Sequence, residues 1–236
     1  MIYIVGVGPG NSLEYLTLKA YQVIKSADVG IYIGEMIGSD IKDVFKDSKL
    51  YCGRHLSIDN VKNLIVNYYQ QCKSIALMMP GDVSLYSGQF NEQLCVGEYV
   101  HWLNNKQMDF ELIPGISSFS AANAKLKLDL TNFIQSQNVF ISSFERLKDL
   151  KQFDDEKLQR ILSTQPNLVL FQSFREWDDI KPIIEKHYSP KSRIIFVYKI
   201  SWNDEVIIDS TLENVEQALH EKQILKHSLI IVTPTL

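Results

Sequence analysis

Cysteine is scarce in this sequence of 236 residues, and the three that it holds, Cys52, Cys72 and Cys95, lie far apart. None forms a C-x-x-C pair or lies near a histidine at the spacing of zinc ligands. We therefore expect neither a disulfide framework nor a structural zinc ion. The five histidines share no local spacing, so we expect them at surface or helix-end positions rather than in a metal site.

Long hydrophobic runs are also missing. The most apolar stretches have the length of a strand and end in polar or turn residues, whereas a membrane-spanning helix needs roughly 20 apolar residues. They are Ile75–Met79, Asn167–Phe171, Ile194–Val197 and Leu229–Val232. The first residues lack the basic region and cleavage site of a signal peptide. We expect a first strand there, no membrane insertion, and a cytoplasmic protein.

Neither sign of charge dominates the sequence. Lysine and arginine total 24 and aspartate and glutamate total 28, which gives a formal net charge of −4. Because no basic face is available for a phosphate backbone, nucleic acid is not an expected partner. The hydrophobic fraction of 45% is ample for the core of one large domain or two small ones.

The first half of the chain has the pattern of repeated βα units. From residue 1 to about residue 113, short β-branched runs alternate with longer amphipathic segments, which predicts a largely parallel sheet. The predicted strands are Ile2–Gly6, Val29–Ile33, Ser48–Tyr51, Ile75–Met79 and Phe110–Ile113. Ser12 and Ser57 each precede apolar residues at helical spacing, so each is predicted to cap a helix that begins directly after it.

The second half of the chain differs in its turns. Asn203-Asp204 lies between two β runs like a hairpin turn, which predicts antiparallel pairing and a mixed sheet. The predicted strands are Val139–Ser142, Leu168–Phe171, Arg193–Lys199, Val206–Asp209 and Ser228–Val232. The charged segment Glu145–Lys157 is an expected exposed connection. We therefore expect an α/β protein of two lobes, residues 1–113 with a parallel sheet and residues 114–236 with a mixed one.

Three loops of small residues follow strands of the first half. Val5–Gly10 reads VGVGPG, and its glycines let the backbone pass close to a ligand. This segment fits a dinucleotide-binding motif poorly, because Pro9 lies inside it and no acidic residue ends the second strand. Pro80–Tyr86 and Pro114–Ser120 follow two further strands. One such loop is often an ordinary turn, but loops after parallel strands meet at one sheet edge, so together they favour a ligand site.

The order of these motifs resembles the tetrapyrrole methylase family over essentially the whole chain. The matching segments are VGVGPGN, Leu16–Ala20, Ser26–Asp28, PGDVSLYSG and ELIPGISSFSAA. The resemblance implies a homodimeric methyltransferase that uses S-adenosylmethionine, needs no metal, acts on a tetrapyrrole, and holds its cofactor in a cleft between two lobes. Tyr198–Glu205 and the following Thr211-Leu212 are similar to the subgroup that methylates carbon 11 of precorrin-4 or cobalt-precorrin-4.

The resemblance also implies which residues contact the cofactor. They are Pro9, Gly81, Asp82, Leu85, Tyr86, Ser117, Ser118, Gln172 and Ile200. Asp82 has an alternative role, since an aspartate stabilises turns through its own backbone and Ser84 can share that task. Tyr86, like Trp202 and Phe119, is a candidate for stacking on a macrocycle, although such aromatics more often pack in a core.

Corrin precursors carry many carboxylates, so cations are candidate substrate contacts. Arg54, Arg175 and Lys199 are the candidates, although a solvated surface position explains each of them as well. No catalytic base can be named from the sequence.

Two positions depart from the family pattern. The usual Gly-Asp-Pro of the second loop is Gly81-Asp82-Val83, and Pro80 precedes it. The alternatives therefore include methylation at another corrin position, a uroporphyrinogen methyltransferase, a diphthine synthase and a ribosomal RNA ribose methylase. A regulator that binds the cofactor without activity is a further alternative, to which Pro80 and Val83 point.

Overall fold

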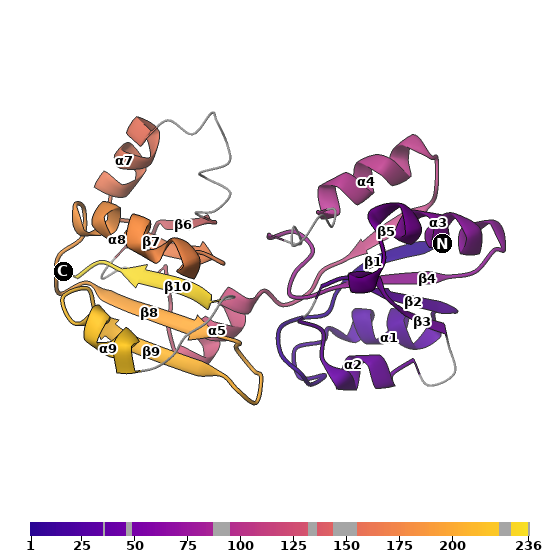
Figure 1. Ribbon diagram of the computed structural model, residues 1–236, viewed down its shortest axis with the longest axis horizontal. Coiled ribbons are helices and arrows are strands. Elements are labelled where there is room, and N and C mark those ends of the chain that lie inside the picture. Colours follow the sequence, from indigo (N-terminus) through magenta and orange to yellow (C-terminus); the bar gives the residue numbers. More distant parts are fainter. Residues whose placement is uncertain are drawn as a thin grey trace. The chain divides into compact units, whose positions relative to one another are not determined.

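The computed structural model describes the chain in two compact units (Figure 1). The described residues are 1–34, 36–45, 49–86, 95–131, 136–143, 155–221 and 228–235, without the side chains of Arg54, Asp155 and Glu221. The first unit comprises Met1–Ala121 and Ser201–Asn203, and the second comprises Ala122–Ile200 and Asp204–Leu236. The units thus separate inside α5 (Ser118–Leu126), whereas the sequence placed the lobe boundary after residue 113.

The first unit is built on a five-stranded sheet in the order β3-β2-β4-β1-β5. Its strands are β1 (Ile2–Gly6), β2 (Val29–Tyr32), β3 (Lys49–Cys52), β4 (Ile75–Met79) and β5 (Phe110–Ile113). All neighbouring strands run parallel, which confirms the predicted parallel sheet. Every residue of the central β4 is buried, because helices cover both faces of a parallel sheet.

Helices pack on both faces of this sheet (Figure 1). Besides a short 3-10 turn at Gly53–His55, they are α1 (Leu18–Ser26), α2 (Ser39–Asp43), α3 (Ile58–Gln70) and α4 (Val96–Asn105). In β1, Ile4 belongs to the core that includes α3 and α4, and Val5 to the core that includes α1 and α2. Alternate residues of one strand therefore supply two cores, as the period of a strand requires.

One of the two predicted helix caps is confirmed and the other is wrong. The Ser57 side chain accepts a hydrogen bond from Asn60 N at 3.2 Å and begins α3. The first helix begins only at Leu18, where Thr17 Oγ1 accepts from Ala20 N at 3.2 Å. Ser12 instead accepts from Glu14 N within a turn. The apolar spacing after Ser12 predicted a helix start that is wrong, because Leu13 is 37% exposed and does not pack in the core.

The second unit contains a mixed sheet in the order β6-β7-β10-β8-β9. Its strands are β6 (Val139–Ser142), β7 (Asn167–Phe171), β8 (Arg193–Tyr198), β9 (Val206–Thr211) and β10 (Ser228–Thr233). β6 and β7 are parallel and the remaining pairs are antiparallel. β8 and β9 pair antiparallel around Asn203-Asp204, so the predicted mixed sheet and its hairpin are confirmed.

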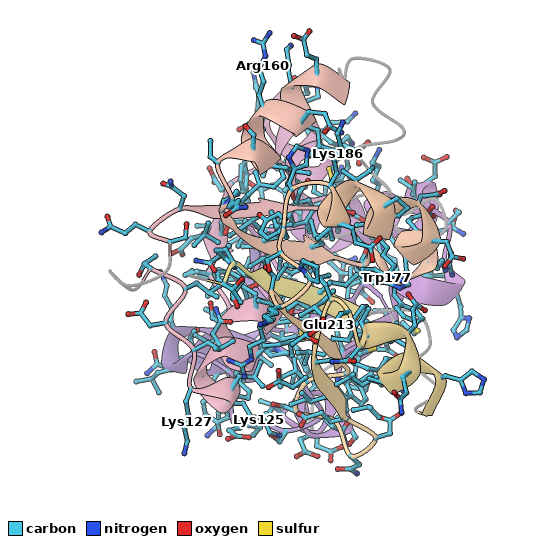
Figure 2. All side chains as sticks on the ribbon, turned by 90° about the vertical axis from the view of Figure 1, so that its left-hand side faces the viewer. Lys125, Lys127, Arg160, Trp177, Lys186 and Glu213 are labelled. Carbon is cyan, nitrogen blue, oxygen red and sulfur yellow. The ribbon has the colours of Figure 1, made fainter. Side chains whose placement is uncertain are left out.

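Helices α7 (Asp155–Ser163), α8 (Trp177–Glu185) and α9 (Val215–Glu221) belong to the core of the second unit, with a 3-10 turn at Phe174–Glu176. The rings of Trp177 and Phe196 meet edge to face at 5.0 Å, and Trp177 Nε1 donates to Glu216 Oε1 at 3.1 Å. Figure 2 shows Arg160 pointing outward from α7. Most of the predicted connection Glu145–Lys157 lies outside the described residues, and its last residues open α7.

None of the helices in the described ranges has both the length and the apolar character needed to cross a bilayer.

The end of α4 offers a test of backbone strain. Met108 N donates to Leu103 O at 3.1 Å and Gln107 N to Asn104 O at 3.0 Å, which is the hydrogen-bond pattern that glycine usually completes. Gln107 is exposed and has a φ of 54°. Because this conformation costs a residue with a side chain about 1 kcal/mol, we expect Gln107→Gly to raise the free energy of unfolding by about 0.5–1 kcal/mol, measured by urea denaturation.

Lys106→Gly is the matched control for this change. Lys106 precedes Gln107, is exposed as well, and has a φ of −87°. Glycine relieves no strain there and adds freedom to the unfolded chain, so the control should lose stability. A gain in both variants, or in neither, would contradict the assignment of strain to Gln107.

Asp28 links α1 to the start of β4. Its Oδ2 accepts from Ser74 N and Ser74 Oγ, both at 2.8 Å, and its Oδ1 accepts from Lys73 Nζ at 3.2 Å. The hydrogen bond from the Ser74 backbone, followed by those from the Ser74 hydroxyl and Lys73, lowers the pKa of Asp28 from 3.8 to about 2.

This lowered pKa predicts a pH dependence of folding. The contribution of Asp28 is complete above its unfolded pKa of 3.8 and disappears as the pH falls toward 2. Asp28→Asn should therefore be less stable than the wild type above pH 4, and the difference should shrink between pH 4 and pH 2. Urea denaturation across this range measures it, and a difference that stays constant with pH would refute the role of the carboxylate.

Candidate cofactor site

The first two loops pair with each other at the carboxyl edge of the first sheet. Gly8 N donates to Gly81 O at 3.0 Å, and Gly81 N donates to Gly8 O at 2.9 Å. Gly8 has a φ of 74° and Gly81 a φ of 71°, a left-handed conformation that glycine adopts without steric cost. The glycines of the two motifs are therefore needed for this bridge.

The third loop packs against the first two loops through its own backbone at Gly115. A Cβ added to Gly115 would lie 2.2 Å from Gly81 O, and a Cβ added to Gly6 would lie 2.7 Å from Gly115 N. Such separations leave no space for a side chain. The three turns thus form one junction of backbone against backbone, which we call the glycine junction and define by Gly6, Gly8, Gly81 and Gly115.

Gly81 differs from the other glycines of the junction because it faces open space. Among the described residues, no heavy atom lies within 4 Å of the position that its Cβ would take. A ligand can therefore approach the backbone of the second loop here, and a side chain would stand in its way. This is the arrangement that the predicted cofactor contact at Gly81 requires.

The carboxylate of Asp82 accepts hydrogen bonds from the second and third loops. Its Oδ1 accepts from Ser84 N at 3.2 Å and from Gly115 N at 3.4 Å, and its Oδ2 accepts from Ser84 Oγ at 2.5 Å. The turn role that the sequence left open for Asp82 and Ser84 is therefore seen. A direct contact of Asp82 with a cofactor stays a prediction.

The two departures in the second loop have structural explanations. The Val83 side chain is only 4% exposed and belongs to the core that includes α3 and α4. The ring of Pro80 lies 3.6 Å from the position that a Cβ on Gly34 would take, which is ordinary packing distance. Neither residue disturbs the glycine junction.

The remaining predicted contacts of the first unit lie on the loops that form the junction. Pro9 is buried between Gly8 and Gly10, and Leu85 N donates to Asp82 O at 3.5 Å. Tyr86 is half-buried and has a φ of 48°.

The third loop leads directly into α5. Ser117 is 6% exposed and its carbonyl accepts from Ala121 N at 3.1 Å, while the half-buried Ser118 is the first residue of the helix. Both serines therefore lie at a helix N-terminus, where backbone amides and the helix dipole favour acceptor groups of a ligand.

Gln172 and Ile200 belong to the second unit, where each follows a strand. Gln172 follows β7 and is half-buried, with a φ of 53°. Ile200 comes just after β8 and is 5% exposed. A left-handed φ at a residue with a side chain is uncommon and is found often at functional sites.

The candidate substrate cations are only partly described. Lys199 Nζ donates to Asp204 Oδ2 at 2.5 Å, and this hydrogen bond raises the pKa of Lys199. Arg175 is exposed, and the side chain of Arg54 lies outside the described residues. Trp202 and Phe119 are half-buried. Among the described residues, no three His, Cys, Asp or Glu side chains gather as a metal ion would require.

Sequence reasoning missed two residues that hold the loops in place. Thr17 Oγ1 donates to Pro114 O at 3.5 Å, and Asn11 Oδ1 accepts from Ser39 N at 3.0 Å. A threonine three residues before a buried alanine is a helix-cap signal that would have found Thr17. The Asn11 contact joins segments far apart in sequence, so no local pattern announces it.

Comparison with known proteins identifies the family of this chain. Residues 1–216 match the family model of the tetrapyrrole (corrin/porphyrin) methylases. The cobalt-precorrin-4 C(11)-methyltransferase of Methanocaldococcus jannaschii is 30% identical over 233 residues, which cover 98% of this chain and 86% of that protein.

Two solved structures share the fold. A cobalt-precorrin-4 methyltransferase superposes with a TM-score of 0.85 at 22% identity, over 98% of this chain and 93% of its own. A uroporphyrin-III C-methyltransferase of Thermus thermophilus, solved with S-adenosylhomocysteine, has a TM-score of 0.72 at 22% identity, over 98% and 96% of the two chains. With the family model spanning most of its length, the chain belongs to the tetrapyrrole (corrin/porphyrin) methylases.

Proposed function

We propose that this methylase transfers the methyl group of S-adenosylmethionine to carbon 11 of precorrin-4 or cobalt-precorrin-4 in cobalamin biosynthesis. Its relative in Methanocaldococcus jannaschii carries that activity in its name, and Tyr198–Glu205 resembles the same subgroup. The observation that carries the proposal is the glycine junction, with the backbone of Gly81 open to a ligand.

The residues on the three loops that meet at the glycine junction suit this methyl donor. Pro9, Gly81, Asp82, Leu85 and Tyr86 would contact it from the first two loops, and Ser117 and Ser118 from the start of α5. Gln172 and Ile200 are the proposed contacts in the second unit. The Thermus relative of the same fold was solved with S-adenosylhomocysteine, which supports a site for the demethylated product as well.

The task of the protein in this reaction is positioning. When bound, the sulfonium group supplies an already activated methyl group, which leaves sulfur as the substrate carbon bonds to it. Holding two reactants in line contributes roughly 7–11 kcal/mol in favourable cases. A junction in which backbone packs directly against backbone is well suited to this, since its geometry cannot change by rotamer motion.

An inactive cofactor-binding regulator is the alternative from another class. Pro80 and Val83 were the features that suggested it. Because Val83 fills a core position and Pro80 packs at ordinary distance beside Gly34, neither residue argues for a damaged site. The structure gives that alternative no specific support.

We also propose that the protein works as a homodimer in the cytoplasm and binds no nucleic acid. The family resemblance supports the first point and the net charge of −4 supports the last. Analytical sedimentation of the purified chain tests the dimer, and a monomer at micromolar concentration would contradict it.

The activity is tested by supplying methyl-¹³C S-adenosylmethionine with one tetrapyrrole at a time. We expect one labelled methyl group on carbon 11 of precorrin-4 or cobalt-precorrin-4, located by ¹³C NMR. Uroporphyrinogen III and later corrin intermediates serve as competing substrates. Label at another ring position would assign the chain to a different member of the family, and cofactor binding without transfer to any tetrapyrrole would favour the regulator.

The open face of Gly81 gives a second test. Gly81→Ala places a methyl group in the space beside the second loop, so we expect the affinity for S-adenosylhomocysteine to fall at least tenfold by calorimetry. The left-handed backbone adds a stability loss of about 1 kcal/mol.

Gly34→Ala is the control for Gly81→Ala. Gly34 also has a positive φ, of 94°, and room for a Cβ, but it is not a predicted contact. The Gly34→Ala variant should lose a similar amount of stability and keep the wild-type affinity for S-adenosylhomocysteine. Equal loss of affinity in both variants would attribute the effect to backbone strain and not to a blocked site.

A further inference from the structure

Two side chains from separate elements hold the peptide group between Pro114 and Gly115. The carbonyl oxygen of Pro114 accepts from Thr17 Oγ1 at 3.5 Å, and the N–H of Gly115 donates to Asp82 Oδ1 at 3.4 Å. These are the two polar groups of one peptide plane. Rotation of that plane would break both hydrogen bonds together.

Each of the two side chains is itself held in place. Thr17 Oγ1 also accepts from Ala20 N at the start of α1, and Ala20 is fully buried. Asp82 accepts two hydrogen bonds from Ser84 within its own turn. The peptide group is therefore fixed between a helix start and a tight turn, both anchored on the first sheet.

The Pro114–Gly115 peptide group governs where the third loop points. Gly115 lies against Gly6 and Gly81 with no space for a Cβ, and Ser117, two residues later, directly precedes α5. A rotation at this point would swing Ser117 and Ser118 away from the position that the junction gives them.

We infer that Thr17 and Asp82 form a pair of positioning residues that fix the Pro114–Gly115 peptide group and thereby orient the third loop for the methyl donor. The inference rests on the proposed function. It gives the Asp82 carboxylate a role inside the protein, so the contact proposed for Asp82 is made by its backbone and its negative charge is not itself a ligand.

Matched variants separate these two roles of Asp82. Asparagine keeps the Oδ1 acceptor for Ser84 N and Gly115 N but has no charge, whereas alanine removes the acceptor. We expect Asp82→Asn to bind S-adenosylhomocysteine within about threefold of the wild type and Asp82→Ala to bind about tenfold more weakly. Equal losses in the two variants would overturn the positioning role and make the charge a cofactor ligand.

Thr17 has its own matched pair. Serine keeps both hydrogen bonds of the hydroxyl, while aspartate caps α1 but has no proton to donate to Pro114 O. Thr17→Ser should keep the wild-type affinity, and Thr17→Asp should lose affinity although α1 remains capped. Unchanged affinity in Thr17→Asp would remove Thr17 from the pair.

Amide exchange tests the same pair without a ligand. In protein labelled with ¹⁵N-glycine, NMR follows the Gly115 N–H directly. We expect it to exchange about tenfold faster in Asp82→Ala than in the wild type, with Asp82→Asn close to the wild type. An unchanged rate in Asp82→Ala would overturn the inference. If the wild type fails to bind S-adenosylhomocysteine, the proposed function fails, and the pair is then judged on this exchange rate alone.

Discussion

The close approach of three backbone turns at the edge of the first sheet is the constraint on which the rest of the site depends. Gly6, Gly81 and Gly115 come so near one another that a Cβ added to Gly6 or to Gly115 would meet backbone atoms at 2.2–2.9 Å. Backbone cannot move aside as a flexible side chain can. The parallel order of β4, β1 and β5 brings the three turns together, and the absence of side chains lets them touch.

The parallel and mixed sheets could be predicted from sequence because their signals are local. Strand-length β-branched runs, and a hairpin turn at Asn203-Asp204, define both sheets within a residue or two of their ends. The first helix could not be placed as well, since Ser12 and Thr17 are both sound cap residues by type. The choice between them depended on whether Leu13 finds a core, which only tertiary packing decides.

The meeting of the three loops was predictable to a similar degree. Glycine-bearing loops after three strands of a parallel sheet imply a shared location, because such loops leave the sheet at the same edge. Which neighbouring groups each side chain contacts could not be predicted. The sequence left Asp82 with two roles, and the contact with Gly115 joins residues that no local pattern relates. Contacts of this kind depend on the registry of β4 and β5 with β1.

The backbone and the side chains of the second loop have different roles, which explains why Val83 fits in it. Its face toward open space consists of backbone at Gly81, whereas its side chains serve the interior: Val83 packs in a core and Asp82 binds the third loop. Val83, in place of the family's usual proline, therefore packs in the core and leaves the open backbone of Gly81 undisturbed. If the proposed cofactor contact of this loop is made by the backbone of Gly81, the loop keeps it wherever the turn, the core contact and the glycine are kept. The short motif is for that reason a better guide to fold and cofactor than to the ring position that is methylated.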